Sequence, residues 1–304
     1  MRVSTQQFFK LSTANMTNQQ SELLKLQGKL ATGQDVQKPS DDPLRLATAL
    51  GAKTNIRQIE SYQSNINLVG NQLSQMDVAL DSAVDVMQAI RDNMLAATNP
   101  VLSQSDRNTI VQDMQARLDQ LRGIANRTDA NGVYLFSGVS EDVEPFTTNT
   151  YAGETVGKSV TITTGRQMDL SITGDQAFYG QGSPDSVFQV VQDAIDDLTP
   201  PYTAAGGNLN VAISNFRARI PDVDNAYDSI LLARTRVGIR QRELDTVEQI
   251  NTASTTELER VAGEAVGLDY AKAISDLAQG QLKLQASQQS FSSTSQLSLF
   301  NFLN

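Results

Sequence analysis

The sequence predicts a mainly α-helical fold: an elongated coiled coil or helical bundle formed by pairing of the N- and C-terminal segments, with a small inserted β domain. Two observations carry this prediction. Apolar residues recur at every seventh position along much of the chain, which is typical of packed helices. Between residues 141 and 183 the pattern changes to the alternation expected of strands. The 304 residues provide material for about two domains.

The two ends of the chain carry matching helical patterns. The first predicted helix reaches Leu30 or Ala31 and is closed by Gly33, a residue that often follows a helix end. Its sevenfold series is Phe9, Met16, Leu23 and Leu30, and that of the last helix is Tyr270, Leu277, Leu284 and Phe291. Residues 279–298 include six Gln and six Ser, so little apolar burial can offset the entropy of ordering them. We expect both ends to be largely disordered in the monomer and to fold on assembly.

A joint is predicted where residues 34–43 combine two prolines with a polar run. Pro39 and Pro43 disfavour helix for the residues before them, and Asp41 or Asp42 can cap the helix that follows. The paired aspartates could instead form a metal or acid–base site, but no partner ligand lies nearby at a useful spacing. The predicted inter-domain joint is therefore Ser40, Asp41, Asp42 and Pro43.

The longest sevenfold series lies between Ile59 and Ala97. Every seventh residue, and the residue three positions after it, is apolar: Ile59, Tyr62, Ile66, Val69, Leu73, Met76, Leu80, Ala83, Met87, Ile90, Met94 and Ala97. This pattern predicts one helix from about Leu44 to Thr98, stopped by Asn99 and Pro100. One long helix of an ordinary bundle would show a similar pattern.

A third helix and a β region follow. Ser103 or Ser105 can cap the helix, whose predicted apolar face is Val111, Met114, Leu118, Leu121 and Ala125. Asn131 and Gly132 then signal a turn, and the residues up to Gly138 favour a strand. Further on, Val160 and Ile162 alternate on one side of a turn at residues 164–166, and Met168, Leu170 and Ile172 alternate on the other. We expect a small β domain made of hairpins.

Helices return after this β region. One is predicted from Ser183, with Pro184 at its first position and an apolar face of Val187, Phe188, Val191, Ile195 and Leu198. Another sevenfold series then runs through Phe216, Val223, Ile230, Val237 and Leu244. Pro221 within this series must either kink the helix or begin its second part.

Composition excludes several classes of function. The chain has no histidine and no cysteine, so it lacks the commonest general base and any thiol nucleophile or zinc–thiolate site. We expect no catalytic, cofactor-binding or metal site, and no enzymatic activity. The net charge of the whole chain is −10, and residues 39–267 alone carry −13. This negative charge opposes nucleic-acid binding. No secretory signal or membrane-spanning segment is visible.

Several stretches, by their order and their distance from the two ends, resemble the flagellin superfamily. Near the ends they are residues 1–5 (MRVST), 30–33 (LATG) leading to 40–43 (SDDP), and 298–300 (SLF). Two others look like the branch of hook-associated proteins at the hook–filament junction: residues 131–138 (NGVYLFSG), and 236–238 (RVG) followed by 268–271 (LDYA). The resemblance spans nearly the whole chain and is weakest in residues 141–183.

The resemblance implies a structural subunit of the bacterial flagellum, located outside the cell. Such proteins are exported unfolded through the flagellar apparatus, without a cleaved signal peptide, while an export chaperone holds the C-terminal segment. They form a ring layer of copies between the other junction protein on the hook side and flagellin on the filament side. Neither nucleic acid nor membrane is an implied partner.

Carried over to this chain, the resemblance implies three domains. Residues 1–42 with 268–304 would form the inner tube, residues 43–140 with 184–267 a helical rod with a β-hairpin, and residues 141–183 a small outer β domain. The implied assembly interface is Phe9, Met16, Leu23, Leu30, Tyr270, Leu277, Leu284, Phe291 and Leu299. These apolar residues could equally form an intramolecular core, since the two interpretations overlap in a coiled rod.

Two alternatives remain open. Filament flagellin shares the folding plan but polymerises without limit; residues 2–5 (RVST) and 134–138 look more like the junction branch. A secreted coiled-coil translocator or tail-fibre protein would share only the heptads.

Overall fold

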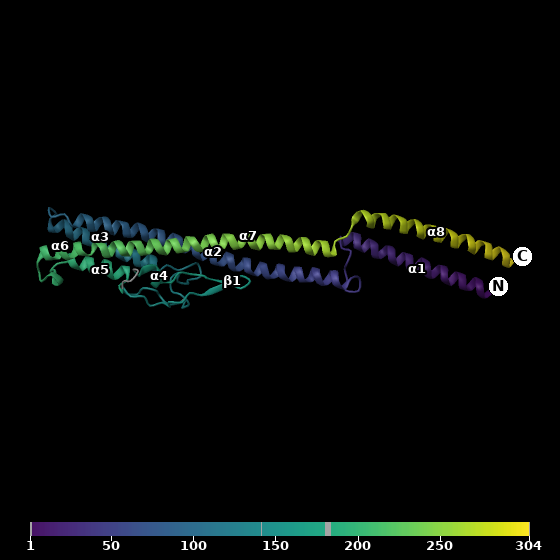
Figure 1. Cartoon of the computed structure of the whole chain (residues 1–304), viewed down its shortest axis with the longest axis horizontal. Helices are drawn as coiled ribbons and strands as arrows, with labels where there is room; N and C mark the ends of the chain where they lie inside the picture. The colour runs from purple at the N-terminus through teal and green to yellow at the C-terminus, as the bar shows by residue number, and fades with distance from the viewer. Residues whose placement is uncertain (1, 141, 180–183, 304) are drawn as a thin grey trace. The chain divides into compact units, whose positions relative to one another are not determined.

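The computed structural model describes residues 2–140, 142–179 and 184–303 (Figure 1). It confirms a mainly helical fold with a small inserted β region. The helices are α1 Arg2–Thr32, α2 Pro43–Ala97, α3 Gln104–Ala125, α4 Gly174–Phe178, α5 Val187–Leu198, the 3-10 turn η1 Thr203–Ala205, α6 Leu209–Ala218, α7 Ile220–Val266 and α8 Tyr270–Leu303. The strands are β1 Ser159–Thr163 and β2 Arg166–Asp169.

Contacts divide the chain into two compact units. One comprises residues 1–58 with 253–304, and the other comprises residues 59–252. The predicted domain boundaries at residues 42 and 268 differ from these unit boundaries; they lie just before α2 and between α7 and α8. The division into three domains remains a prediction. We refer to the terminal unit and the central unit below.

The heptad on α2 forms the spine of the central unit. Of its twelve apolar positions, all except Ile59 and Tyr62 are buried. They pack in one core with α3 and α7, including the buried residues Met114, Leu118, Leu121, Val223, Ile230, Val237 and Leu244. The sevenfold series thus marked the buried faces correctly, as expected for long helices whose stability comes mainly from packing.

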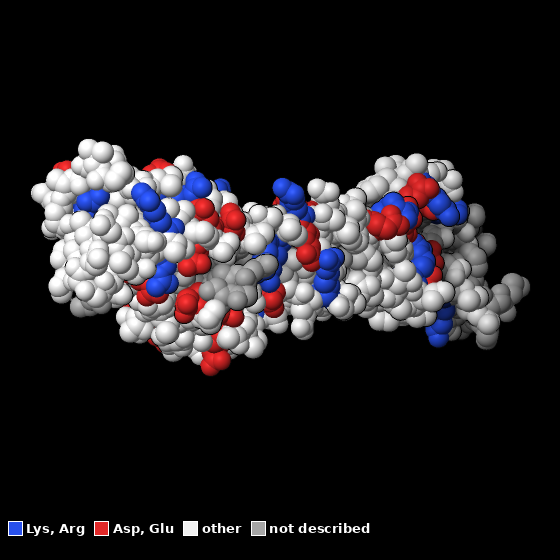
Figure 2. Space-filling model, turned by 60° about the vertical axis from the view of Figure 1, so that its left-hand side comes forward, with Lys and Arg blue, Asp and Glu red and all other residues white. Residues whose placement is uncertain are grey.

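Polar contacts fix α2 antiparallel to α7 within the central unit. Gln63 Nε2 donates to Glu248 Oε1 at 2.9 Å, and Arg91 Nε donates to Asp224 Oδ1 at 2.5 Å. Between these pairs, Arg234 contacts Asp77 and Asp81 at 3.1 and 2.5 Å. These side chains are partly exposed, so each pair adds little stability but favours one register. Acidic and basic side chains accordingly lie interspersed on the face in Figure 2.

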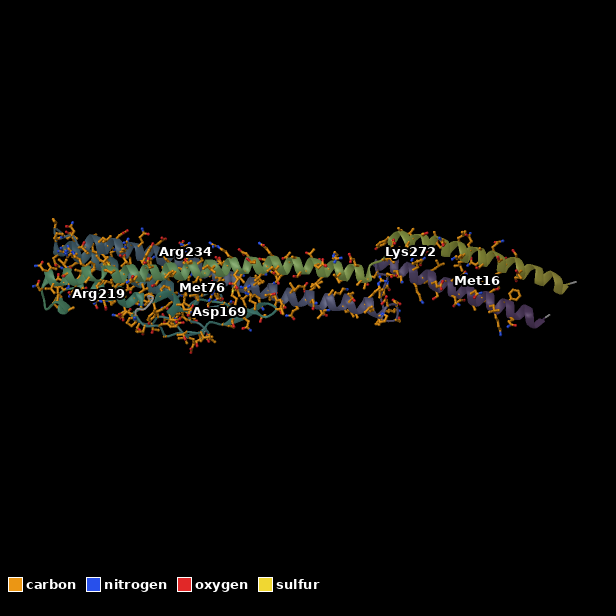
Figure 3. The ribbon with its side chains drawn as sticks, in the orientation of Figure 1. Met16, Met76, Asp169, Arg219, Arg234 and Lys272 are labelled. Atoms are coloured by element: carbon orange, nitrogen blue, oxygen red, sulfur yellow. The ribbon has the colours of Figure 1, made fainter. Side chains whose placement is uncertain are left out.

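The β region consists of one described hairpin. Val160 pairs with Met168 across a turn in which Gly165 has a φ of 75°, so the predicted turn is confirmed. The predicted alternation is wrong beyond Leu170, because β2 ends at Asp169 and residues 170–174 are all buried. Asn65 Nδ2 on α2 donates to Thr161 O at 2.8 Å, tying the hairpin to the helices. Arg240 on α7 adds contacts with Ser171 O at 3.0 Å and with Asp169 at 3.2 Å; Asp169 is labelled in Figure 3.

The strand predicted up to Gly138 is wrong. The described residues there form turns, with a single bridge between Thr128 and Tyr134. The Asp129 carboxylate accepts the backbone N–H groups of Asn131 and Val133, which holds the turn and lowers the pKa of Asp129. Residues 135–138 are buried consecutively rather than alternately, so this stretch fills the core as an irregular segment.

The start predicted for the helix after the β region is also wrong. The helix α5 begins at Val187, because the side chain of Ser186 accepts the N–H of Gln189 and caps it. Pro184 precedes the helix, and Ser183 lies outside the described residues. The predicted apolar face of α5 is confirmed as buried.

Other predicted boundaries are confirmed. Ser103 caps α3 with a complete capping box to Asp106. Pro221 is the second residue of α7, after α6 ends at Ala218, so it begins the second part of the series. Arg107, which the patterns did not single out, is 3% exposed and donates to Leu102 O and Asn99 O, thereby closing the turn between α2 and α3.

Candidate assembly surface and joint of the terminal helices

Helices α1 and α8 form an antiparallel pair in the terminal unit (Figure 1). The rings of Phe9 and Phe291 meet edge to face with centroids 5.4 Å apart. Leu23 fills the space above Gly280, where an added Cβ would lie 2.7 Å from Leu23 Cδ2. The structure therefore brings the two predicted series together within one chain.

The residues between the helices are only half covered. Those at intermediate exposure are Phe9, Met16, Leu23, Leu30, Leu277, Leu284 and Phe291. Met16 lies on α1 beside α8 (Figure 3). Tyr270 is 52% exposed, and the side chain of Leu299 lies outside the described residues. Two helices alone cannot enclose such a seam, so additional burial is available to whatever packs beside them.

Other apolar residues on both helices are more exposed than the residues between them. Leu24 is 63% exposed on α1, and Leu282 is 68% exposed on α8. A groove of about 230 Å³ between the helices is lined by Leu23, Leu26, Gly280 and polar residues. The buried Oε1 atom of Gln19 in this groove has no hydrogen-bond partner among the described residues.

The predicted joint residues form the turn that starts α2. Asp42 Oδ1 accepts the N–H groups of Leu44 and Arg45, so Asp42 is the helix cap, with Pro43 at the first position. Asp41 Oδ2 accepts the N–H groups of Gln37 and Lys38, which lowers the pKa of Asp41. Ser40 and Pro43 are exposed. These residues cap and turn the chain.

The connector at residues 33–36 makes the long-range contacts of the joint. The N–H of Asp35 donates to Val266 O at 2.8 Å, and the N–H of Leu268 donates to Gly33 O at 3.1 Å. Val36 is buried in a small cluster with Ala49 and Val266. The connector therefore lies as a short paired segment against the end of α7.

The carboxylate of Asp35 forms ion pairs with two basic side chains at this joint. Its carboxylate lies 2.9 Å from Lys29 Nζ at the end of α1 and 2.7 Å from an Arg45 Nη1 atom at the start of α2. Arg45 Nε also donates to Ala265 O at 2.8 Å. Hydrogen bonds from Lys29 and Arg45 lower the pKa of Asp35, so its carboxylate is ionised at neutral pH. The heptad patterns did not single out Asp35. The available signal in the sequence was an acidic residue in a turn with basic residues, Lys29 and Arg45, on either side of it.

Gly33 is the position where the joint most clearly requires glycine. Its φ is 69°, and an added Cβ would lie 2.7 Å from the hydroxyl of Tyr270. We expect Gly33→Ala to destabilise the joint by about 1–2 kcal/mol, because alanine is strained in the left-handed region. Amide hydrogen exchange should then show roughly tenfold lower protection at Asp35 and Leu268. Gly28→Ala is the matched control: a Cβ added at Gly28 in α1 would meet no atom within 4 Å outside the helix's own backbone, so alanine should preserve or raise protection.

Among the described residues, no cluster of His, Cys, Asp and Glu side chains could hold a metal ion. None of the described helices is long and apolar enough to cross a membrane.

Residues 3–141 match the family model of the bacterial flagellin N-terminal helical region. Along its whole length the chain is similar to flagellar hook-associated protein 3 of Salmonella typhimurium, with 28% identity over 99% of both chains. It is 24% identical to a flagellin of Salmonella montevideo over 91% of this chain, but over only 52% of that flagellin.

A solved structure has the same fold. The flagellar junction protein FlgL from Legionella pneumophila superposes with a TM-score of 0.60 and 20% identity, over 72% of this chain and 100% of that one. The matched N-terminal region and the full-length similarity agree with the order of the stretches noted in the sequence. The chain is therefore similar to bacterial flagellins in its N-terminal helical region and to flagellar hook-associated protein 3 along its whole length.

Proposed function

We propose that this chain is a structural subunit of the bacterial flagellum that forms the layer joining hook-side proteins to the flagellin filament. The observation that carries the proposal is the similarity to hook-associated protein 3, which extends over 99% of both chains. The half-covered seam of α1 and α8 supports it, because a subunit that assembles needs apolar surface left for its neighbours.

The proposal includes where the subunit acts and how it assembles. Copies of the chain form a ring, with the other junction protein on the hook side and flagellin on the filament side. The chain leaves the cell unfolded without a cleaved signal peptide, and a chaperone holds its C-terminal segment during export. The absence of cysteine supports this route, because a disulfide would obstruct passage of an unfolded chain.

Assembly is proposed to order the terminal segments. Residues 1–42 with 268–304 become the inner tube, while residues 141–183 form the outer domain. The seam residues, with Tyr270 and Leu299, carry the contacts of assembly, and residues 40–43 turn the chain between layers. Full helicity by circular dichroism in the dilute monomer would contradict ordering on assembly.

The role is proposed to be structural rather than enzymatic, in line with the flagellar proteins to which the chain is similar. Filament flagellin is the second candidate, since flagellins also match 91% of the chain. The junction role is favoured because the chain spans about half of that flagellin but nearly all of hook-associated protein 3.

Deleting the gene distinguishes these candidates. We expect cells with hooks but no filaments by electron microscopy, and flagellin released into the medium, because filament subunits are still exported but have no layer on which to assemble. Complete absence of flagellin would identify the chain as the filament protein. Unaltered flagella would refute both roles.

A further inference from the structure

The heptads of α1 and α8 leave the register of the pair undetermined. Apolar residues repeat every seven positions on both helices, so sliding one helix by seven residues again places apolar against apolar. Phe9, for example, would then face Leu284 instead of Phe291. The polar Gln19, which could have selected one register, has its buried oxygen unpaired. The seam itself therefore provides weak discrimination.

One register nevertheless extends from the joint towards the ends. Gln34 pairs with Gly267 at the joint, Leu23 faces Gly280, and Phe9 faces Phe291. Between successive contacts, the number of residues traversed towards the N-terminus nearly equals the number traversed towards the C-terminus. The contacts at the joint thus specify the same alignment as those about 25 residues further out.

The joint has contacts that a slipped pair could not keep. The N–H of Asp35 is held by Val266 O, and its carboxylate joins Lys29 of α1 to Arg45 of α2. Arg45 Nε in turn donates to Ala265 O, at the end of α7 and five residues before α8 begins at Tyr270. This clamp ties the last turn of α1 to the start of α2 and to the end of α7, and only three residues separate the end of α7 from α8.

We propose that Asp35 is a positioning residue: by joining Lys29 to the Arg45–Ala265 contact, it sets the register in which α1 and α8 pair. The clamp lines a water-accessible groove of about 420 Å³, and its three side chains are about a third exposed. Such ion pairs contribute little to stability. They can still select between two registers whose seams are nearly equivalent in apolar contact.

The native chain has no cysteine, so introduced cysteines report the register directly. In the purified full-length chain, Leu23→Cys, Leu30→Cys and Gly280→Cys are combined, so that Cys at position 280 can pair with either of the other two. Only the partner at 23 is in register; the one at 30 requires a slip of seven residues, about 10 Å, which a disulfide cannot bridge. Oxidation followed by mass spectrometry gives the ratio of the two disulfides, even where pairing is transient.

We expect the 23–280 disulfide to dominate, and Asp35→Asn to lower its excess over 30–280 by about tenfold, as loss of two exposed ion pairs would. Asp35→Glu keeps the charge and should restore most of the excess, while the thermal midpoint of the central unit stays unchanged. Arg260→Gln, which removes an exposed ion-pair cluster elsewhere on α7, is the control and should leave the ratio unaltered.

A wild-type ratio near one, or a ratio that Asp35→Asn changes by less than twofold, would overturn the proposal. A second measurement rests on the proposed function: cells producing Asp35→Asn in a cysteine-free background should carry fewer filaments than those producing Asp35→Glu. Equal filament numbers would show that the register set by Asp35 does not matter for assembly. The disulfide ratio needs no flagellum, so its failure is distinct from a failure of the junction role.

Discussion

Replacing Leu284 and Phe291 together by aspartate is expected to abolish incorporation of the chain into the flagellum. Both side chains lie half buried in the seam, and Phe291 packs edge to face on Phe9. Full burial of such a side chain, completed on assembly, is worth about 1.5–3 kcal/mol, which aspartate loses while adding charge to an apolar surface. Cells producing the double variant should be non-motile, with hooks but without filaments.

The matched control places the same charges away from the seam. Gln285 and Ser290 are exposed on α8, and Gln285→Asp with Ser290→Asp adds two carboxylates to the same helix. This variant should remain motile. Purified protein of both variants should unfold at the same urea concentration as wild type when a reporter of the central unit is followed, because these residues lie in the terminal unit. Normal motility of the seam variant would refute the proposed interface.

Predictions from the sequence were most successful where one periodic signal decided the structure. The apolar series on α2 and α7 identified buried faces because a long helix keeps one face towards the core over many turns. Local chemistry likewise placed the caps at Asp42 and Ser103, where a side-chain oxygen meets free N–H groups at a helix start.

The sequence failed where a local preference competed with a side-chain contact. Residues 133–137 are strand formers, yet Asp129 draws the preceding backbone into a turn, and Gly138 continues it with a φ of 78°. Likewise, Pro184 can begin a helix, but Ser186 supplies the cap that starts α5 three residues later. Intrinsic propensity allowed either conformation at each place, and side-chain hydrogen bonds of Asp129 and Ser186 determined which one formed.

The joint shows what no local pattern can reveal. The cap at Asp42 was visible because its partners are two and three residues away. The clamp depends on Arg45 meeting Ala265, which is 220 residues further along the chain. Such a pair becomes apparent only after α2 and α7 are aligned, so the sequence could mark Asp35 as an acid between basic residues but not as the centre of a clamp.

Phe146→Ala is expected to destabilise the central unit by about 3–5 kcal/mol, the cost of emptying a fully buried aromatic site. Phe146 is 0% exposed, and its ring centroid lies 4.6 Å from that of Phe188 and 5.5 Å from that of Phe178. In a unit of this size the loss corresponds to a thermal midpoint lower by about 10 °C. Circular dichroism of the purified chain measures it.

The effect should be large because Phe146 joins the inserted segment to the helices. Its backbone N–H donates to Asn126 Oδ1 at 2.9 Å, and its carbonyl accepts from Asn126 Nδ2 at 2.8 Å, at the end of α3. In Phe146→Ala, Asn126 can still bond the backbone of residue 146, but the space filled by the ring becomes a cavity. Val143→Ala is the control: Val143 lies in the same segment but is 40% exposed, so its removal should change the midpoint by less than about 2 °C. Equal effects of the two substitutions would mean that the segment is not anchored through its aromatic core.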